Sequence, residues 1–340
     1  MAKIISFFNH KGGVSKTTTA YHVAWMLSDK GYKVLMVDTD SQCNLTGLAI
    51  GEDSFERFYE ENPNNNIKSA LDPAFLGQPI PIQAIEGVQV KENLWLVPGH
   101  IDITEFDISL GMAHNFSTSM AILMNLPGAI YAFIQKMVEK HQIDYVLIDM
   151  NPSLSETNKN LLTISDYFIV PTAPDFFSQM ALSTLASTVP KWKKWSLTAR
   201  AFFRDSIYPF PEKDPKFLGI VMQNFTIRKG SPTQAFQGKI DSVVEKVQNT
   251  VIPAFEPQDL VLDGEKRAIQ ERVEYCLAYI SNFQSLAPKM QEDNGPSIPV
   301  FAIDEKYLGT GQVLENYLEK RQMFYKVFSD MVDEIVNLTN

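Results

Sequence analysis

Residues 4–19 of this chain read IISFFNHKGGVSKTTT, and they decide the fold. The apolar residues 4–8 predict a short buried strand, and the apolar positions of residues 20–29 recur at helical spacing. A glycine-bearing turn joins the two. Such a turn directs backbone N–H groups inward, and the N-terminus of the following helix adds partial positive charge. Residues 9–19 are therefore predicted to bind the phosphates of a nucleotide.

A lysine and a hydroxyl residue close this loop. Lys16 is placed to meet the outer phosphates of a nucleotide, and Thr17 is placed to be the hydroxyl ligand of Mg²⁺. The alternative interpretation is a basic, glycine-containing turn that binds no ligand. Matching motifs elsewhere in the chain favour the phosphate-binding interpretation.

The loop departs from the general pattern G-x-x-x-x-G-K-[ST] at both outer glycines, where this chain has His10 and Ser15. It carries instead two adjacent glycines and a second lysine, Lys11, five residues before Lys16. The arrangement K-G-G-x-x-K-T resembles the deviant Walker A motif of the ParA and MinD family of ATPases. The resemblance implies a nucleotide-sandwich dimer in which Lys11 reaches across to the partner's phosphates.

The family resemblance also implies which residues contact ATP. Besides the loop, it points to Asn224, which follows the predicted strand 217–223 and would contact the adenine ring. An asparagine directly after a strand is also a common turn residue, so that interpretation stays open. The implied ATP contacts are Gly12, Gly13, Val14, Ser15, Lys16, Thr17, Thr18 and Asn224.

Carboxylates end two further predicted strands. Residues 33–38 end in Asp38, with Asp40 two positions later, in a segment D-T-D-S-Q-C-N-L-T that is similar to the family's D-x-D-P-Q-x-N-x-T. Residues 145–149 end in Asp149 and have the form of a Walker B strand. By resemblance, Asp38 and Asp149 shape the Mg²⁺ shell, and Asp40 positions the attacking water. Aspartates that close a strand are otherwise common turn formers.

The turn after the second of these strands departs from the family's D-T-P-P-S at two positions. Met150 removes a hydroxyl group, and Asn151 removes a rigid proline. We therefore expect this second switch loop to move, or to sense the nucleotide, differently.

Predicted strands alternate with helices along the chain. The strands lack strict polar alternation, which favours a parallel sheet covered on both faces. Right-handed crossovers then place the carboxyl ends of the strands, and hence all the motifs above, along one edge. The sequence predicts an α/β fold with a doubly wound, mostly parallel sheet flanked by helices, in a single domain of residues 1–340. Strands with their exit turns are expected at 4–8, 33–38, 94–99, 145–149, 166–174, 217–224 and 300–303, helices at 20–29, 117–141, 264–283 and 311–338, and an irregular passage at 47–93.

The composition of the chain limits the kinds of protein that it can be. The chain has 340 residues, 45% of them hydrophobic, which supports a sizeable core. A formal charge of −10 argues against a broadly nucleic-acid-coating surface, although a local basic patch can still bind a phosphate backbone. Cys43 and Cys276 have no metal-ligand spacing, which disfavours an iron–sulfur carrier. No apolar stretch reaches the roughly 18 residues of a membrane span, so we expect a cytoplasmic protein without a membrane partner.

Two segments, 178–216 and 253–296, are longer than the core fold needs. The first interleaves basic residues with aromatic ones, a composition that can bind a phosphate backbone. The alternative, which we favour, is an amphipathic helix with its Trp rings in the core and its lysines solvated. The second segment is interpreted as an added element for partner recognition or dimer geometry. The candidates for DNA contact are Lys191, Lys193, Lys194, Arg200 and Arg204.

Together with the resemblance, these motifs predict a Mg²⁺-dependent ATPase that forms an ATP-sandwich homodimer. Lys11 would act in trans on the phosphates and Lys16 in cis. The family implies ParA-like partition of a plasmid or chromosome, with non-specific DNA binding, nucleoid association and weak turnover stimulated by a ParB-like partner. One alternative is an ATP-switched regulatory protein that acts on a protein partner without DNA, which the acidic balance favours. Another is a metabolic ligase built on the same loop, for which no substrate-specific motif is found.

Overall fold

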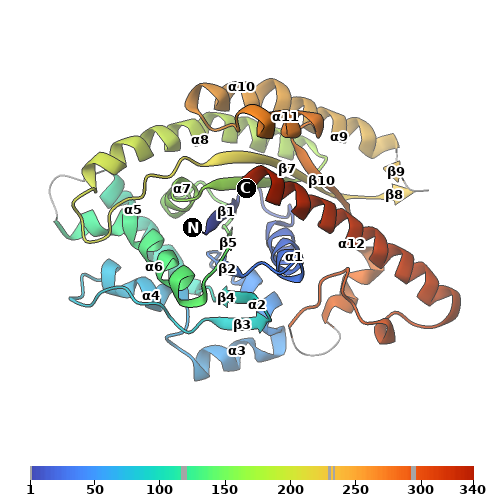
Figure 1. Ribbon diagram of the computed structural model, residues 1–340, viewed down its shortest axis with the longest axis horizontal. Coiled ribbons are helices and arrows are strands. Elements are labelled where there is room, and N and C mark those ends of the chain that lie inside the picture. The colour runs from blue at the N-terminus through green and yellow to red at the C-terminus, as the bar shows by residue number, and fades with distance from the viewer. Residues whose placement is uncertain (1, 116–120, 229–230, 233, 292–295) are drawn as a thin grey trace.

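The computed structural model describes residues 2–115, 121–228, 231–232, 234–291 and 296–340. Within this part of the chain, an eight-stranded sheet has helices packed on both faces (Figure 1). Each strand runs parallel to its neighbours except β3, which pairs antiparallel with β4, so the predicted α/β fold class is confirmed. In sheet order the strands are β10 (Cys276–Ser281), β7 (Lys216–Phe225), β6 (Tyr167–Thr172), β1 (Lys3–Phe7), β5 (Tyr145–Asp149), β2 (Val34–Asp38), β4 (Leu94–Val97) and β3 (Val88–Lys91). A separate hairpin joins β8 (Ile227–Arg228) to β9 (Ser231–Pro232).

Each face of the sheet has its own layer of helices. On one face, α1 and α12 bury apolar side chains against the sheet; on the other, α4 to α10 do so (Figure 1). Every residue of β2 and β5 is buried, which explains why these strands lack polar alternation. The helices are α1 (Lys16–Asp29), α2 (Asn44–Ile50), α3 (Glu52–Glu61), α4 (Ile67–Phe75), α5 (Glu105–Asn115), α6 (Leu126–His141), α7 (Glu156–Thr163), α8 (Phe176–Phe202), α9 (Gln234–Lys246), α10 (Ile252–Phe255), α11 (Gly264–Arg272) and α12 (Gly311–Thr339).

The structure corrects three predictions of local structure. Residues 264–283 form α11 and then strand β10, because the apolar run of β10 pairs with β7 at the edge of the sheet. Residues 300–303 form turns instead of a strand, although Val300 and Ile303 are fully buried. The passage 47–93, expected to be irregular, contains α3, α4 and β3.

Two other predicted segments are resolved as follows. Residues 117–120 of the predicted helix 117–141 lie outside the described residues, and the remainder holds a 3₁₀ turn (Ala121–Asn125) followed by α6. The segment 178–216 is occupied mainly by α8, the 27-residue helix that crosses from β6 to β7. It is therefore part of the sheet's regular crossover pattern, and the segment 253–296 likewise supplies β10 to the same sheet.

The carboxyl ends of the three central strands meet at one edge. In the strand register, Phe7 of β1 and Asp38 of β2 both pair with Asp149 of β5. The loop after β1 therefore begins beside both predicted carboxylates. The fold brings together the motifs that were expected to share a site.

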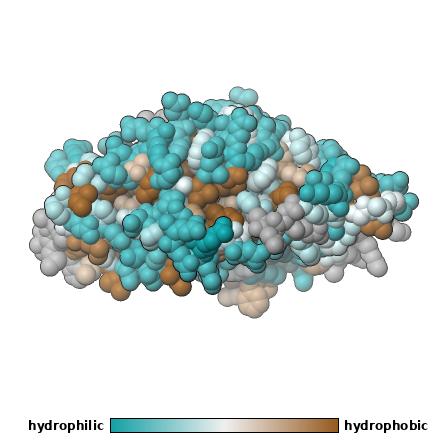
Figure 2. Space-filling view, turned by 90° about the horizontal axis from the view of Figure 1, so that it is seen from below, coloured by the Kyte–Doolittle hydropathy of each residue, from teal (hydrophilic) through white to brown (hydrophobic). Residues whose placement is uncertain are grey.

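The surface is mixed in character. Figure 2 shows hydrophilic residues around small groups of hydrophobic ones on one face. The predicted final helix is confirmed as α12, and it packs Phe324, Phe328 and Met331 into the core. In the described ranges, we find no helix with the length and apolarity that a membrane crossing requires.

Candidate nucleotide site

The loop between β1 and α1 borders a cavity of about 890 Å³. All the loop residues implied to contact ATP, 12–18, line it. Gly13 has φ 71°, a left-handed conformation that glycine adopts without steric cost. Because α1 begins at Lys16, the positive end of its dipole lies at this cavity. The opposite wall comes from α2, α3 and the segment that follows β2.

The Lys16 ammonium is buried beside this cavity. Its Nζ donates to the carbonyl oxygen of Lys11 at a long 3.4 Å, and within the described residues no other acceptor bonds to it. Burial lowers the pKa of Lys16, while the nearby carboxylates of Asp149 and Asp40 oppose that shift. A buried ammonium can donate three hydrogen bonds. Its spare donors are therefore available to an anionic ligand.

The Asp149 carboxylate is fully buried. Neither oxygen has a hydrogen-bond partner among the described residues. Burial, together with repulsion from Asp38, raises the pKa of Asp149 to about 8, and the neighbouring Thr17 hydroxyl opposes this. A buried carboxylate without a partner is costly unless a cation compensates it. The hard oxygen donors of Asp149 and Thr17 fit Mg²⁺, which takes one or two carboxylates and completes its shell with water and phosphate oxygens.

Asp38 is equally buried, but its carboxylate is already hydrogen-bonded. Its Oδ2 accepts from the backbone N–H and the hydroxyl of Thr46 at 2.8 and 2.7 Å. Its Oδ1 accepts from the backbone N–H of Asp40 at 3.2 Å. Burial raises the pKa of Asp38 to about 6, against the lowering effect of these bonds. Asp38 thus fixes the segment 39–46 beside the cavity, whereas Asp149 keeps its oxygens free.

Asp40 occupies the wall of the cavity. Its Oδ1 accepts from the backbone N–H of Gln42 at 3.0 Å. It also lines an adjoining cleft of about 550 Å³ that reaches Ile108 and Asn151. Asp40 therefore lies between the phosphate loop and the turn after β5, where a carboxylate could orient a water molecule.

The Lys11 ammonium is directed away from the cavity. It pairs with the carboxylate of Asp175 and donates to Ser178 Oγ at 3.1 Å. Asp175 is also the N-cap of α8, since its Oδ1 accepts from the backbone N–H of Ser178 at 2.7 Å. Among the described residues that line the cavity, Lys11 is absent. The two loop lysines are therefore placed differently. Lys16 lies at the cavity of its own subunit, whereas Lys11 lies at the start of α8.

Ser15, which replaces the usual glycine, has φ 57° and ψ 35°. This left-handed conformation costs a non-glycine residue about 1 kcal/mol. The Ser15 hydroxyl donates to Oδ1 of Asn224 at 3.3 Å, and Nδ2 of Asn224 donates to the Gly13 carbonyl at 3.0 Å. Asn224, expected at an adenine ring, thus contacts the phosphate loop, and it is not among the described residues that line the cavity.

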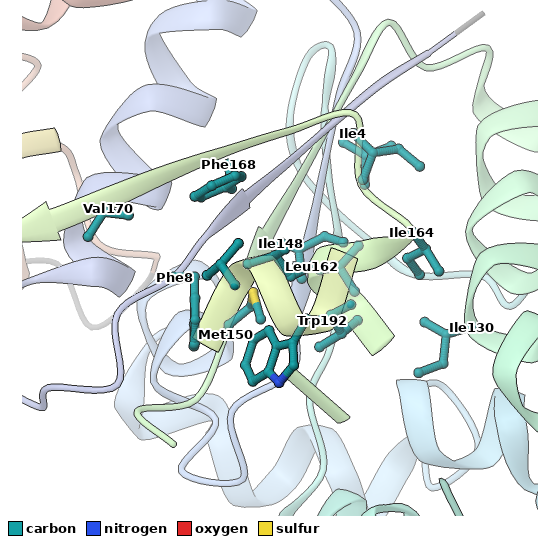
Figure 3. Packing of buried hydrophobic residues seen from close by; sticks show 14 of the residues in the cluster. Ile4, Phe8, Ile130, Ile148, Met150, Leu162, Ile164, Phe168, Val170 and Trp192 are labelled. Carbon is teal, nitrogen blue, oxygen red and sulfur yellow. The ribbon is translucent and has the colours of Figure 1, made fainter. Parts of the chain in front are cut away.

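The two substituted residues after β5 are both fixed in place. The side chain of Met150 is fully buried, and Figure 3 shows it beside Phe8 and Trp192, whose rings lie 5.4 Å apart. Met150 therefore joins the end of β5 to the core under α8. Asn151 accepts from Nδ2 of Asn158 on α7 through its backbone and side-chain oxygens, at 2.9 and 3.0 Å. These hydrogen bonds restrain the turn where the family has proline.

The basic residues of α8 and of the turn after it fall into two groups. Lys193 and Arg200 both pair with Asp214, and the Lys193 side chain is buried. In this structure both charges are therefore engaged by Asp214, which makes them weaker candidates for DNA contact than the exposed residues. Trp192 is buried in the core, as the amphipathic-helix interpretation requires. The exposed candidates are Lys191, Lys194 and Arg204.

Two residues that shape the site received no role from the sequence. Thr46 holds Asp38, and it belongs to the D-T-D-S-Q-C-N-L-T segment. Asp175 holds Lys11, and it ends the segment after β6. Both lie in family-like segments, so their sequence positions were a usable signal, but their partners depend on the fold.

Comparisons with known proteins agree with this geometry. The family model described as an AAA domain matches residues 2–199. The chromosome partitioning protein ParA of Caulobacter vibrioides is 26% identical over 257 residues, which cover 74% of this chain and 80% of that protein. The chain spans about half the length, 52%, of two Mycobacterium tuberculosis relatives.

Solved structures share the fold. A plasmid partition protein from Borrelia burgdorferi B31 bound to AMPPNP is 20% identical with a TM-score of 0.54, and the match covers 99% of this chain and 98% of that one. The structure of pNOB8 ParA bound to nonspecific DNA is 21% identical with a TM-score of 0.54, with the same coverage of 99% and 98%. Given the phosphate loop, the register of its carboxylate-bearing strands and these matches, the chain belongs to the ParA/MinD-like family of P-loop ATPases.

Proposed function

We propose that this chain is a Mg²⁺-dependent ATPase whose ATP-bound form is a sandwich homodimer, and that this dimer is a positioning switch in plasmid or chromosome partition. The observation that carries the proposal is the different placement of the two loop lysines. Lys16 is buried at the chain's own cavity, whereas Lys11 lies outside it on Asp175. A lysine placed outside its own nucleotide cavity is available to a second copy's nucleotide.

Within one subunit, four side chains would act on the nucleotide. Lys16 would bind the outer phosphates through its spare donors, and Thr17 and Asp149 would hold Mg²⁺. The ion, when bound, would neutralise charge on the phosphate oxygens. Asp40 would orient the attacking water. Asp38 would support the metal side of the site by holding the segment that carries Asp40.

Across the dimer, Lys11 would leave Asp175 and reach the partner's phosphates. Exposed apolar side chains near this edge support a second copy as the partner. Phe176 and Phe177, directly after Asp175, are 67% and 68% exposed, and Ile108 beside the Asp40 cleft is 73% exposed. Exposed apolar side chains that gather near a site favour association.

The same dimer would bind DNA without sequence preference through α8, and a ParB-like partner would stimulate its weak turnover. Exposed Lys191, Lys194 and Arg204 supply a local basic group on a chain whose net charge is −10. A phosphate backbone is bound through such charges and releases counterions, so binding must weaken with salt.

The test is DNA binding by the full chain with ATP and Mg²⁺, measured by fluorescence anisotropy on two unrelated duplexes across a salt series. We expect equal affinities for the two duplexes and a steep loss of affinity with salt. The double variant Lys191→Glu with Lys194→Glu should lose DNA binding and keep ATP turnover. A matched control, Lys136→Glu with Lys326→Glu, changes the charge equally on α6 and α12 and should retain DNA binding.

Absent or salt-insensitive binding would exclude the DNA function. It would leave the alternative, an ATP-switched regulator of a protein partner. That alternative is supported by the acidic balance of the chain and by the pairing of Lys193 and Arg200 with Asp214.

A further inference from the structure

The end of β7 is tied to the phosphate loop by two consecutive side chains. Gln223 donates through Nε2 to the Thr19 hydroxyl, and that hydroxyl donates to the Ser15 carbonyl at 2.6 Å. Asn224 donates through Nδ2 to the Gly13 carbonyl at 3.0 Å, and its Oδ1 accepts from the Ser15 hydroxyl at 3.3 Å. The loop is therefore held from the side of β7 at three of its polar atoms.

The chemistry of these contacts fixes the orientation of the Asn224 amide. A carbonyl oxygen can only accept, so the amide atom that faces Gly13 must be the Nδ2 donor. Oδ1 then faces Ser15, whose hydroxyl must be the donor. Both polar atoms of Asn224 are consequently directed at the loop.

A bulge in β7 places Asn224 there. In the register with β10, Gln223 pairs with Ile280 and Phe225 pairs with Ser281, which leaves Asn224 as the extra residue. Its φ is 61°, a left-handed conformation that asparagine tolerates better than most residues. Bulges beside functional sites commonly redirect a side chain. Here the redirected side chain reaches a loop that follows a different strand.

Ser15 is the loop residue that depends most on this support. It holds the left-handed conformation that a glycine would adopt freely. Its carbonyl is bonded by Thr19, and its hydroxyl is bonded to Asn224. The Ser15 side chain, which a glycine would lack, therefore supplies a hydrogen bond that anchors the loop.

We propose that Asn224 is a positioning residue for the phosphate loop, acting through Gly13 and Ser15, rather than a reader of the nucleotide base. The inference rests on the proposed function only for the identity of the ligand. Because Asn224 contacts loop atoms that surround the phosphates, its loss should weaken every ligand that carries the triphosphate, with or without a base.

The first test measures the affinity of the full chain for ATP and for inorganic triphosphate, by calorimetry with Mg²⁺. Asn224→Gly is the informative variant, because glycine keeps the positive φ and removes only the amide. We expect both ligands to lose affinity by the same factor, about tenfold for two hydrogen bonds. A loss confined to ATP, with inorganic triphosphate unchanged, would overturn the proposal and restore Asn224 as a base reader.

Ser15→Gly provides the matched control. It keeps the loop backbone and removes the hydroxyl that donates to Asn224. In this background Asn224→Gly should cost less affinity than in the wild type, because one of its two loop contacts is already gone. If Asn224→Gly lowered affinity by the same factor in both backgrounds, the proposed contact between Asn224 and Ser15 would be contradicted.

Hydrogen exchange of the nucleotide-free chain gives an independent readout. Asn224→Gly should speed amide exchange in residues 11–17 and leave the central strands β1 and β5 unchanged. Unchanged exchange in the loop would overturn the proposal even if nucleotide affinity falls. A wild-type chain that binds no nucleotide would refute the proposed function, and the exchange result would still decide whether β7 positions the loop.

Discussion

The phosphate loop and the middle of α8 both carry basic side chains close together, but the fold treats their charges differently. In the loop, Lys16 has a single long hydrogen bond, and Asp149 beside it has no partner among the described residues. In α8, Lys193 and Arg200 share the carboxylate of Asp214. Buried charges left without partners indicate a ligand site, whereas paired ones indicate structural support. The motif predicts the phosphate site from the sequence, whereas the pairing of Lys193 and Arg200 with Asp214 is established only by the fold.

The largest expected difference between the two regions concerns nucleotide affinity. Lys16→Ala should lower ATP affinity about 1,000-fold, because it removes charge-assisted hydrogen bonds to the phosphates. Lys193→Ala should leave that affinity unchanged and instead lower the free energy of unfolding by about 1–2 kcal/mol through lost packing and pairing. Calorimetry and chemical denaturation of both variants check this. Loss of ATP affinity in the Lys193 variant would contradict a purely structural role for Lys193.

The second prediction concerns a buried side chain behind the loop that is fully bonded. His22 bonds to the Thr18 carbonyl through Nδ1 at 2.7 Å and accepts from the backbone N–H of Val300 at 3.1 Å. Burial lowers its pKa from 6.5 to about 4. The unfolded chain therefore binds more protons between these pH values, so stability falls as pH drops from 6.5 toward 4, by about 3 kcal/mol in full.

Denaturation midpoints at several pH values measure this loss. Carboxylates also titrate in that range, among them Asp38 with its pKa raised to about 6, so the comparison is with His22→Gln, which lacks only the titrating ring. The variant should show a flatter profile between pH 6.5 and 5. Profiles of equal slope would exclude His22 as the cause.

The third prediction applies one kind of substitution to both regions. Asp149→Asn should raise the free energy of unfolding of the nucleotide-free chain by about 1–2 kcal/mol, because it removes a buried acid whose pKa is raised to about 8 and whose burial is therefore costly. Asp214→Asn should lower it by a similar amount, because Lys193 and Arg200 lose their shared partner. Denaturation without nucleotide measures both signs. If both variants were destabilised, the distinction between the two regions would fail.

The smallest expected effect concerns the contact that holds Lys11. Asp175→Asn keeps a good N-cap for α8 and removes the negative charge that pairs with the Lys11 ammonium. If this contact competes with binding in trans, the variant should dimerise at a few-fold lower ATP concentration. Sedimentation velocity over an ATP series measures the shift. Asp333→Asn, which removes a similar ion pair with Lys30, is the control and should leave dimerisation unchanged.

The parts of the site that could be predicted from the sequence are those formed by consecutive residues. The loop 9–19 and the carboxylates that end β2 and β5 are such parts, because a strand, its exit turn and the next helix are contiguous. The sheet order, the pairing of Lys11 with Asp175 and the redirection of Asn224 by a bulge join residues far apart in the chain. No local pattern encodes those contacts.

The wrong predictions have similar physical causes. Strand β10 was expected as helix because the mixed-charge residues of α11 run directly into its short apolar stretch. Residues 300–303 were expected as a strand because they are apolar, yet they pack on the helical layer without joining the sheet. In both cases the local sequence did not determine which element the segment packs against.

Lys11 is proposed to act on the nucleotide of a second subunit, and mixing two inactive variants tests this. Lys11→Ala and Asp40→Ala should each be inactive alone. In a mixed dimer, the Lys11→Ala subunit keeps Asp40 for its own ATP and receives Lys11 from its partner, so one site of two is complete. An equal mixture should therefore recover up to about a quarter of wild-type turnover, since half of randomly paired dimers are mixed. A mixture no more active than the two variants measured separately would show that Lys11 does not act on the partner's nucleotide.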